Sequence, residues 1–152
     1  MYEFSETSLE RLKTCHKDLQ EIMQWSLKYS QVDFGIACGH RTIQEQKRLY
    51  AQGRNLPGQI VTYVDGIQKR SKHNYYPSQA VDIYGWTGKV DWSERTLIYL
   101  GGVITSVASF LYDEGIVKHQ LRWGGNWDGD GQIVTDQNFL DLPHYELVNV
   151  AT

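Results

Sequence analysis

Residues of the types that bind zinc occur in two short segments that lie far apart in this sequence. The first segment, S-K-H-N-Y-Y-P-S-Q-A-V-D, contains His73 and Asp82, and the second, D-L-P-H, ends at His144. Asp82 lies between Val81 and Ile83, and side chains alternate between the two faces of a strand. If these apolar neighbours face a core, Asp82 faces the other side, beside the loop that carries His73. Because two imidazoles and one carboxylate are a frequent ligand set of catalytic zinc, the sequence predicts zinc at His73, Asp82 and His144.

Hydrolysis at such a site requires a proton acceptor as well as the metal. Zinc held by two neutral imidazoles and one carboxylate keeps a net positive charge, which acidifies a bound water and polarises a carbonyl group. A base must then take the proton from that water and pass it to the leaving amine. Asp141 lies three residues before His144, and the rigid Pro143 lies between them. We therefore predict that Asp141 is the general base, close to the metal without binding it.

Arg41 directly precedes a predicted helix N-terminus, where a positive charge is locally unfavourable. Thr42 and Glu45 form a capping-box pattern that opens the helix, and the helix dipole already makes this end electropositive. The arginine is explained if the junction faces an anion or a developing oxyanion. The alternative interpretation is that Arg41 pairs with a surface carboxylate.

The segment N-W-D-G-D-G-Q-I-V-T-D-Q, residues 126–137, partly matches a calcium-binding loop. Asn126, Asp128 and Asp130 occupy the first, third and fifth positions of the EF-hand pattern. The twelfth position is Gln137 instead of glutamate, with Asp136 beside it, and no helical periodicity flanks the loop on the correct side. Two interpretations stay open: a calcium site formed by Asn126, Asp128, Asp130 and Asp136, or a structural turn with solvated carboxylates.

Hydrophobic periodicity and capping motifs predict the elements that position these residues. Helices are predicted at residues 7–27, 42–53 and 91–115. Strands are predicted at residues 33–38, 80–84, 121–123 and 145–148, and a hairpin is one interpretation of residues 64–66. Pro143 cannot donate a ladder hydrogen bond, so the last strand should begin at or after it. Gly101 and Gly102 interrupt the third helix and predict close packing against a neighbour. We expect one α+β domain over residues 1–152.

Composition and charge exclude several classes of protein. The formal net charge of −3 gives no basic footprint for nucleic acid. No apolar run approaches the ~20 residues that a membrane span needs, so we expect no membrane insertion. The first residues, M-Y-E-F-S-E-T-S, lack the order of a signal peptide, and we expect synthesis in the cytosol. Cys15 and Cys38 are too few for a cysteine-based zinc site or a disulfide scaffold, and both are interpreted as small buried hydrophobes.

Together, S-K-H, A-V-D and the late D-L-P-H-Y-E resemble the zinc D-Ala-D-Ala carboxypeptidase and L-alanyl-D-glutamate endopeptidase family. R-T-x-x-x-Q at residues 41–46 and W-G-G-N-W at residues 123–127 are similar, in the same order, to the phage endolysin-like branch. The resemblance covers residues 39–148. Asp141 stands where the D,D-dipeptidase branch has glutamate, which favours the endolysin-like branch. The gap between His73 and Asp82 is longer than in the commonest family pattern.

The resemblance implies the α+β fold of the hedgehog and D,D-peptidase domains, in which helices flank a small antiparallel sheet. It assigns zinc to His73, Asp82 and His144, the general base to Asp141, and substrate or oxyanion contact to Arg41. It implies an endolysin that accumulates in the host cytoplasm and cuts the L-Ala–D-Glu bond of the peptidoglycan stem peptide, and we expect a monomer. Two alternatives stay open: a D-Ala-D-Ala carboxypeptidase, and a non-catalytic wall-binding or virion structural module.

Overall fold

The structure, a computed structural model, describes residues 1–151. Its α-helices are α1 (Glu6–Leu12), α2 (Lys17–Tyr29), α3 (Ile43–Ala51) and α4 (Glu94–Asp113), and a 3-10 helix, η1, covers Lys72–Asn74. Its strands are β1 (Asp33–Cys38), β2 (Ala80–Trp86), β3 (Val90–Asp91), β4 (Leu121–Gly124) and β5 (Asp141–Leu147).

The strands form one antiparallel sheet in the order β1-β2-β5-β4, with β3 paired to β2. The last strand in the sequence, β5, therefore lies in the middle of the sheet, between β2 and β4. This placement brings the two segments with metal-ligand residues onto adjacent strands. The prediction of an α+β fold with a small antiparallel sheet flanked by helices is confirmed.

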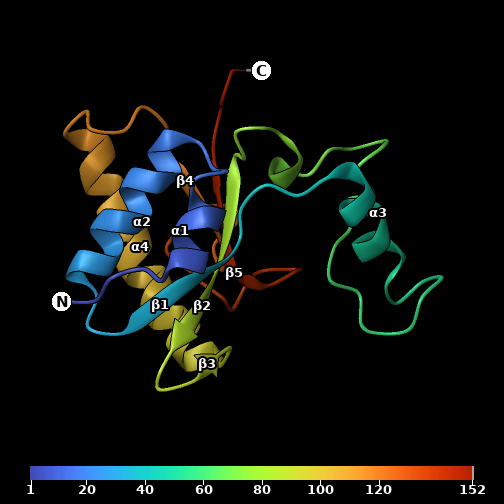
Figure 1. The fold of residues 1–152 in the computed structure, drawn as a ribbon, viewed down its shortest axis with the longest axis horizontal. Helices are drawn as coiled ribbons and strands as arrows, with labels where there is room; N and C mark the ends of the chain where they lie inside the picture. Colours follow the sequence, from blue (N-terminus) through green and yellow to red (C-terminus); the bar gives the residue numbers. More distant parts are fainter. Residues whose placement is uncertain (152) are drawn as a thin grey trace.

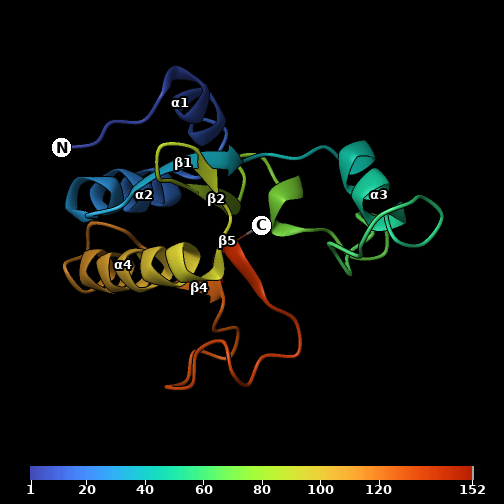
Figure 2. The same cartoon turned by 90° about the horizontal axis from the view of Figure 1, so that it is seen from below.

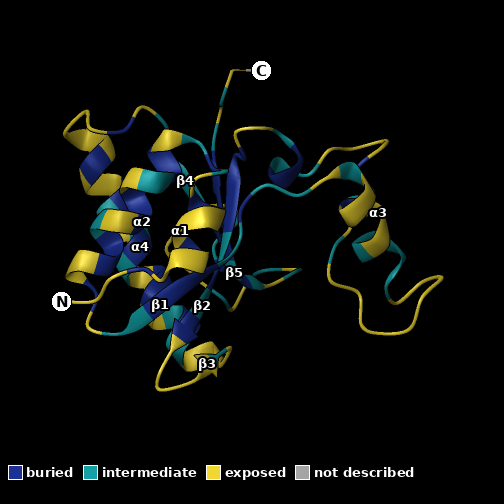
Figure 3. Ribbon diagram, viewed as in Figure 1, coloured by how far each residue is buried: buried dark blue, intermediate teal, exposed yellow. Residues whose placement is uncertain are grey.

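The two faces of the sheet have different neighbours. Figure 2 shows α2 and α4 on one side of the sheet, while α3 and the loop after it project on the other side. Helix α1 packs against β1, and the arm formed by residues 43–70 stands away from the helical layer (Figure 1). The core lies between the sheet and the helices, and much of the arm is exposed (Figure 3).

Helix α4 is the central helix of this core. The helix has 20 residues, and an 18-residue window of it has a mean hydropathy of 1.3, so by length and composition alone the helix resembles a membrane span. Leu97, Leu100, Ile104 and Leu111 are buried, and α4 contacts α2, β4 and β5. The apolar face of α4 thus has its partners within this chain.

The prediction of one helix over residues 7–27 is wrong, because the helix is interrupted between Leu12 and Lys17. The backbone N–H of His16 donates to the Ser78 carbonyl at 2.8 Å, and the Ser78 N–H donates to the Thr14 carbonyl at 2.8 Å. These tertiary hydrogen bonds hold the linking residues in an extended bridge. The N-caps of α1 and α2 are Ser5 and His16, and the N-cap of α4 is Ser93 instead of Asp91.

Two loop predictions also differ from the structure. Strand β5 begins at Asp141, two residues before Pro143, because the register between β4 and β5 shifts at this point. Pro143 lies within the irregularity, where its missing N–H interrupts no paired position. Residues 64–66 form a turn instead of a hairpin, and Asp65 Oδ1 accepts hydrogen bonds from the N–H groups of Ile67 and Gln68.

Candidate metal centre and catalytic cleft

The register of the sheet places Asp82 and His144 directly opposite each other. They are cross-strand neighbours on β2 and β5, where Cβ atoms approach to about 4.5–5.5 Å. Val81 and Tyr145, their neighbours in sequence, are fully buried on the face that packs on the helices. The alternation predicted around Asp82 is therefore present, and the Asp82 and His144 side chains face the arm.

His73 reaches the same point from η1. Its Nε2 lies 3.2 Å from Asp82 Oδ1, and His144 Nδ1 lies 3.0 Å from the same oxygen. The carbonyl of His73 accepts a hydrogen bond from the Arg41 N–H at 2.8 Å, which joins η1 to the segment before α3. The structure thus brings the three predicted zinc ligands into one cluster.

The outer nitrogens of both imidazoles face groups that can only accept hydrogen bonds. His73 Nδ1 lies 2.7 Å from the Gly39 carbonyl oxygen, and His144 Nε2 lies 2.9 Å from Glu146 Oε1. Each outer nitrogen therefore carries a proton, and in the neutral tautomer each inner nitrogen presents its lone pair to Asp82.

Three acceptor atoms that converge in this way require a positive charge between them. Burial alone would lower the pKa values of His73 and His144, but the Asp82 carboxylate raises them to about 9 and about 10. The same pairing holds the pKa of Asp82 well below its usual range, although burial opposes this. Protons on the inner nitrogens can supply the charge, and so can a metal ion. The donor set and its buried setting fit Zn²⁺.

Arg41 lies beside this cluster and is oriented by a buried glutamine. Its Nη2 donates to Asp82 Oδ2 at 3.4 Å, and its Nη1 donates to Gln46 Oε1 at 2.9 Å. Gln46 is fully buried, and its Nε2 donates to the Val64 carbonyl at 2.7 Å. Thr42 and Glu45 form the predicted capping box, so the helix start that places Arg41 is confirmed. The carboxylate that pairs with Arg41 lies in the site and not on the outer surface.

Asp141 lines the same cleft as His144 although an odd number of positions separates them. In a regular strand, residues three apart point to opposite faces. The register shift between Trp123 and Gly124 removes this conflict, and both side chains face the cavity. Burial raises the pKa of Asp141 to about 6, and repulsion from Asp82 contributes to the shift.

The cleft has a volume of about 580 Å³, and three parts of the chain form its walls. The sheet face supplies the cluster, the arm supplies residues such as Leu49 and Tyr63, and the 126–140 loop supplies Trp127 and Phe139. The Tyr63 and Phe139 rings meet edge to face with centroids 5.1 Å apart, so the arm and the loop touch across the cavity.

Two residues near the cluster were not predicted from the sequence. Cys38, interpreted there as a buried hydrophobe, is the β1 neighbour of Asp82, and its Sγ lies 4.0 Å from His73 Nδ1. Its pKa is lowered, since the hydrogen bond and charge of His73 outweigh burial. Glu146 follows His144 by two positions, so strand alternation alone could have placed it on the same face. Cys38 belongs to no motif recognised in the sequence, whereas Glu146 ends the segment D-L-P-H-Y-E, in which only Asp141 and His144 were given roles.

In the 126–137 loop, the Asp128, Asp130 and Asp136 carboxylates lie within 4.8 Å of one another and are exposed. Asn126 Oδ1 is buried and, among residues 1–151, has no hydrogen-bond partner. Asn126 Nδ2 donates to the Asp130 carbonyl at 3.0 Å, which closes the loop on itself. All four predicted calcium residues therefore lie in one compact loop.

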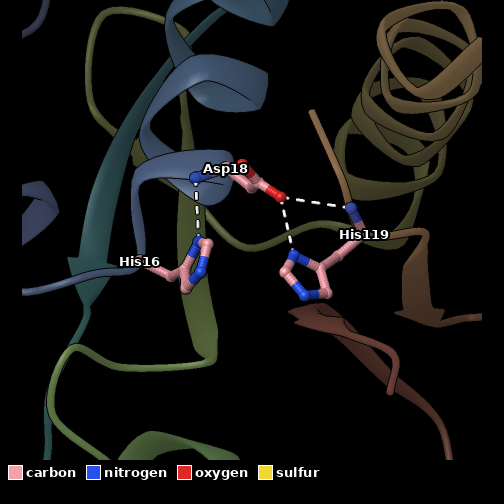
Figure 4. Close-up of side chains that lie close together, drawn as sticks. All are labelled: His16, Asp18 and His119. Carbon is pink, nitrogen blue, oxygen red and sulfur yellow. Dashed lines mark hydrogen bonds and ion pairs between the residues drawn. The ribbon is translucent and has the colours of Figure 1, made fainter. Parts of the chain in front are cut away.

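A second histidine–aspartate cluster, His16, Asp18 and His119, joins the start of α2 to the segment before β4 (Figure 4). Asp18 Oδ2 accepts hydrogen bonds from the N–H groups of Lys118 and His119 and from His119 Nδ1. His16 Nδ1 accepts from the Asp18 N–H and caps α2. Because these contacts already engage the polar atoms that face one another, we interpret the cluster as a structural clasp.

Comparisons with known proteins agree with this geometry. The sequence model of the phage L-alanyl-D-glutamate peptidase family matches residues 1–148. The peptidoglycan L-alanyl-D-glutamate endopeptidase CwlK of Bacillus subtilis (strain 168) is 30% identical over 118 residues. That match covers 77% of this chain and 62% of CwlK, so the chain spans less than two thirds of this relative.

Among solved structures, the fold is similar to that of the Serratia marcescens L-Ala D-Glu endopeptidase ChiX, with a TM-score of 0.69. The two chains are 22% identical, and the superposition covers 96% of this chain and 90% of ChiX. The family assigned from the ordered motifs is thus confirmed: this chain belongs to the phage L-alanyl-D-glutamate peptidase family.

Proposed function

We propose that this protein is a zinc-dependent peptidoglycan endopeptidase that hydrolyses the L-Ala–D-Glu bond of the stem peptide. The observation that carries the proposal is the convergence of His73, Asp82 and His144 at the floor of a cleft that Asp141 and Arg41 also line. The choice of the L-Ala–D-Glu bond as the cleaved bond rests on the description of the family and on the name of CwlK. The cell wall is then the place where the enzyme acts, after its release from the host cytoplasm.

Five polar residues of the cleft have a role in this reaction. His73, Asp82 and His144 would hold zinc, which when bound acidifies water and polarises the scissile carbonyl. Asp141 is a partly buried carboxyl whose pKa of about 6 suits a group that accepts a proton near neutral pH and returns it to the leaving amine. Arg41, fixed by Gln46, places a permanent positive charge beside the position where the oxyanion develops.

The walls of the cleft suit an acidic peptide. Lys69, Arg70 and Lys72 line the cavity, and a stem peptide carries free carboxylates. The Lys72 ammonium group donates to the Leu147 carbonyl at 3.3 Å, and Arg70 lies over the Tyr75 ring, so both are held near the cavity. These cations would attract the acidic peptide by long-range steering that weakens with salt.

The test is digestion of purified peptidoglycan, with and without a chelator, followed by identification of the new termini. New D-Glu amino termini that disappear with the chelator and return with zinc support the proposal. Free D-Ala instead of new amino termini would identify a D,D-carboxypeptidase. Binding of the wall without any new terminus would identify a non-catalytic wall-binding module.

We also propose that the 126–137 loop binds calcium through Asn126, Asp128, Asp130 and Asp136. The support is the buried Asn126 oxygen, which has no partner among the described residues, next to three carboxylates that repel one another. A cation would satisfy both. Calcium titration followed by calorimetry tests this: the wild type should bind one equivalent and Asp130→Asn should bind more weakly. Equal heats in the two proteins would contradict the assignment.

A further inference from the structure

Glu146 lies on the cleft face of the sheet, beside the candidate metal centre. It follows His144 by two positions on β5, so both side chains project from the same face of the strand. On the neighbouring strand β4, Arg122 is the direct cross-strand partner of Glu146. Glu146 is only 7% exposed, yet it is a charged residue. A carboxylate buried to this extent requires partners on both of its oxygens.

Both oxygens of Glu146 have such partners. Oε1 lies 2.9 Å from His144 Nε2, and Oε2 accepts a hydrogen bond from Arg122 Nη2 at 2.8 Å. Glu146 is thus a carboxylate that accepts hydrogen bonds from the imidazole and from the guanidinium group. A continuous row of contacts runs from Arg122 through Glu146 and His144 to Asp82.

The contact determines which nitrogen of His144 is free. A neutral imidazole carries one proton, and a carboxylate acceptor at Nε2 holds it there. Nδ1 then keeps its lone pair, directed at Asp82 Oδ1, 3.0 Å away. His73 receives the equivalent support from the Gly39 carbonyl, a backbone group. Glu146 is therefore the side chain through which the tautomer of one candidate ligand can be tested.

We propose that Glu146, held in place by Arg122, is a positioning residue that fixes the tautomer and ring orientation of His144 for metal binding. The inference rests on the proposed zinc site and deepens it. Acceptors behind metal-bound imidazoles raise ligand basicity and restrict the ring, and their loss costs about 10- to 100-fold in metal affinity. Arg122 acts one step further away, so its loss should cost less.

The experiment measures the zinc dissociation constant of the purified full chain by competition with a chromophoric chelator. Glu146→Ala should bind zinc about 10- to 100-fold more weakly than the wild type. Glu146→Gln keeps one acceptor oxygen and should lose less. Arg122→Met keeps the aliphatic stem and removes the guanidinium, and its loss should be smaller than that of Glu146→Ala. Glu10→Ala, an exposed carboxylate on α1, is the matched control and should bind as the wild type does.

The outcomes separate this inference from the proposed function. A wild-type protein that binds no zinc refutes the metal centre itself. A wild type that binds zinc, together with unchanged affinity in Glu146→Ala, overturns the role of Glu146 alone. Melting of the metal-free variants gives the second readout. The Ala and Gln variants could lose equal zinc affinity and show equal, proportionate decreases in melting temperature. That result would show that Glu146 only supports the fold, and it would also overturn the proposal.

Discussion

Two adjacent glycines in α4 allow a matched test of how the core supports the cleft. A Cβ atom added at Gly101 would overlap the indole ring of Trp123, whereas one added at Gly102 would meet open space. The indole cannot easily move aside, because it stacks near Tyr145 and its Nε1 donates to the Leu142 carbonyl at 2.7 Å. The close packing predicted for the glycine pair thus applies to Gly101 and not to Gly102.

The expected free energies follow from two opposing effects. Replacing glycine by alanine inside a helix contributes about 1 kcal/mol through helix propensity at either position. At Gly101 the added methyl group also overpacks the core, which costs about 1–3 kcal/mol. Gly102→Ala should therefore stabilise the protein by up to about 1 kcal/mol. Because the propensity gain is common to both variants, Gly101→Ala should lie about 1–3 kcal/mol below Gly102→Ala, the cost of overpacking alone.

Equilibrium urea unfolding followed by tryptophan fluorescence measures this difference through the midpoint, provided that the m-value stays constant. In thermal unfolding, each 1 kcal/mol should shift the melting temperature by about 2–4 °C for a chain of this size. Gly101→Ala should also lower activity, since Leu142, which Trp123 holds, is the neighbour of Asp141. Equal stability of the two variants would refute the argument that Trp123 occupies the space at Gly101.

Three further perturbations test the cleft and the clasp. Asp141→Asn should keep zinc affinity while turnover falls by about 10²- to 10⁴-fold, and a variant with normal turnover would exclude Asp141 as the base. Gln46→Leu removes the acceptor that orients Arg41, a hydrogen bond worth ~1.5–3 kcal/mol, so kcat/KM should fall about 10- to 100-fold. Gln46→Glu keeps the acceptor and serves as the control variant. Equal kcat/KM of the Leu variant and the wild type would contradict the role of Gln46. The pKa of Asp18 is lowered in the folded protein, because hydrogen bonds from His119 and the adjacent backbone outweigh burial. The ionised Asp18 therefore stabilises the fold fully above the unfolded pKa of ~3.9. This stabilisation is lost as the pH falls through the lower folded pKa. Asp18→Asn should thus be less stable than the wild type at pH ~7 by about 1.5–3 kcal/mol, with a gap that narrows towards pH ~3; a gap independent of pH would argue against an ionised Asp18.

The sequence allowed prediction where local pattern and chemistry coincide. The alternation around Asp82 placed its side chain opposite the core, and the capping box of Thr42 and Glu45 placed Arg41 before α3. The proximity of His73 to Asp82 and His144 was expected from the chemistry of zinc and is present in the structure. The roles of these residues stay predictions until the metal and the reaction are measured.

Other features depend on contacts that no local pattern contains. The hydrophobic repeat runs through residues 7–27, but Ser78, far along the chain, takes the hydrogen bonds of Thr14 and His16 and divides the helix. Glu146 could be placed on the cleft face by alternation, yet its partner Arg122 depends on the pairing of β4 with β5. Cys38 lies opposite Asp82 after a register shift that follows Ile36 on β1, which a hydrophobic pattern does not reveal.

The register shift beside Pro143 has a consequence for how this site can change over generations. Asp141 and His144 are three residues apart, a spacing that would place them on opposite faces of a regular strand. They share the cleft only because the register shifts opposite Trp123 and Gly124. The added Cβ of any residue other than glycine at position 124 would collide with the Asp141 carbonyl, so the compensation is built into the backbone. A lineage can therefore exchange one carboxylic acid for the other at position 141 more readily than it can gain or lose a single codon in D-L-P-H.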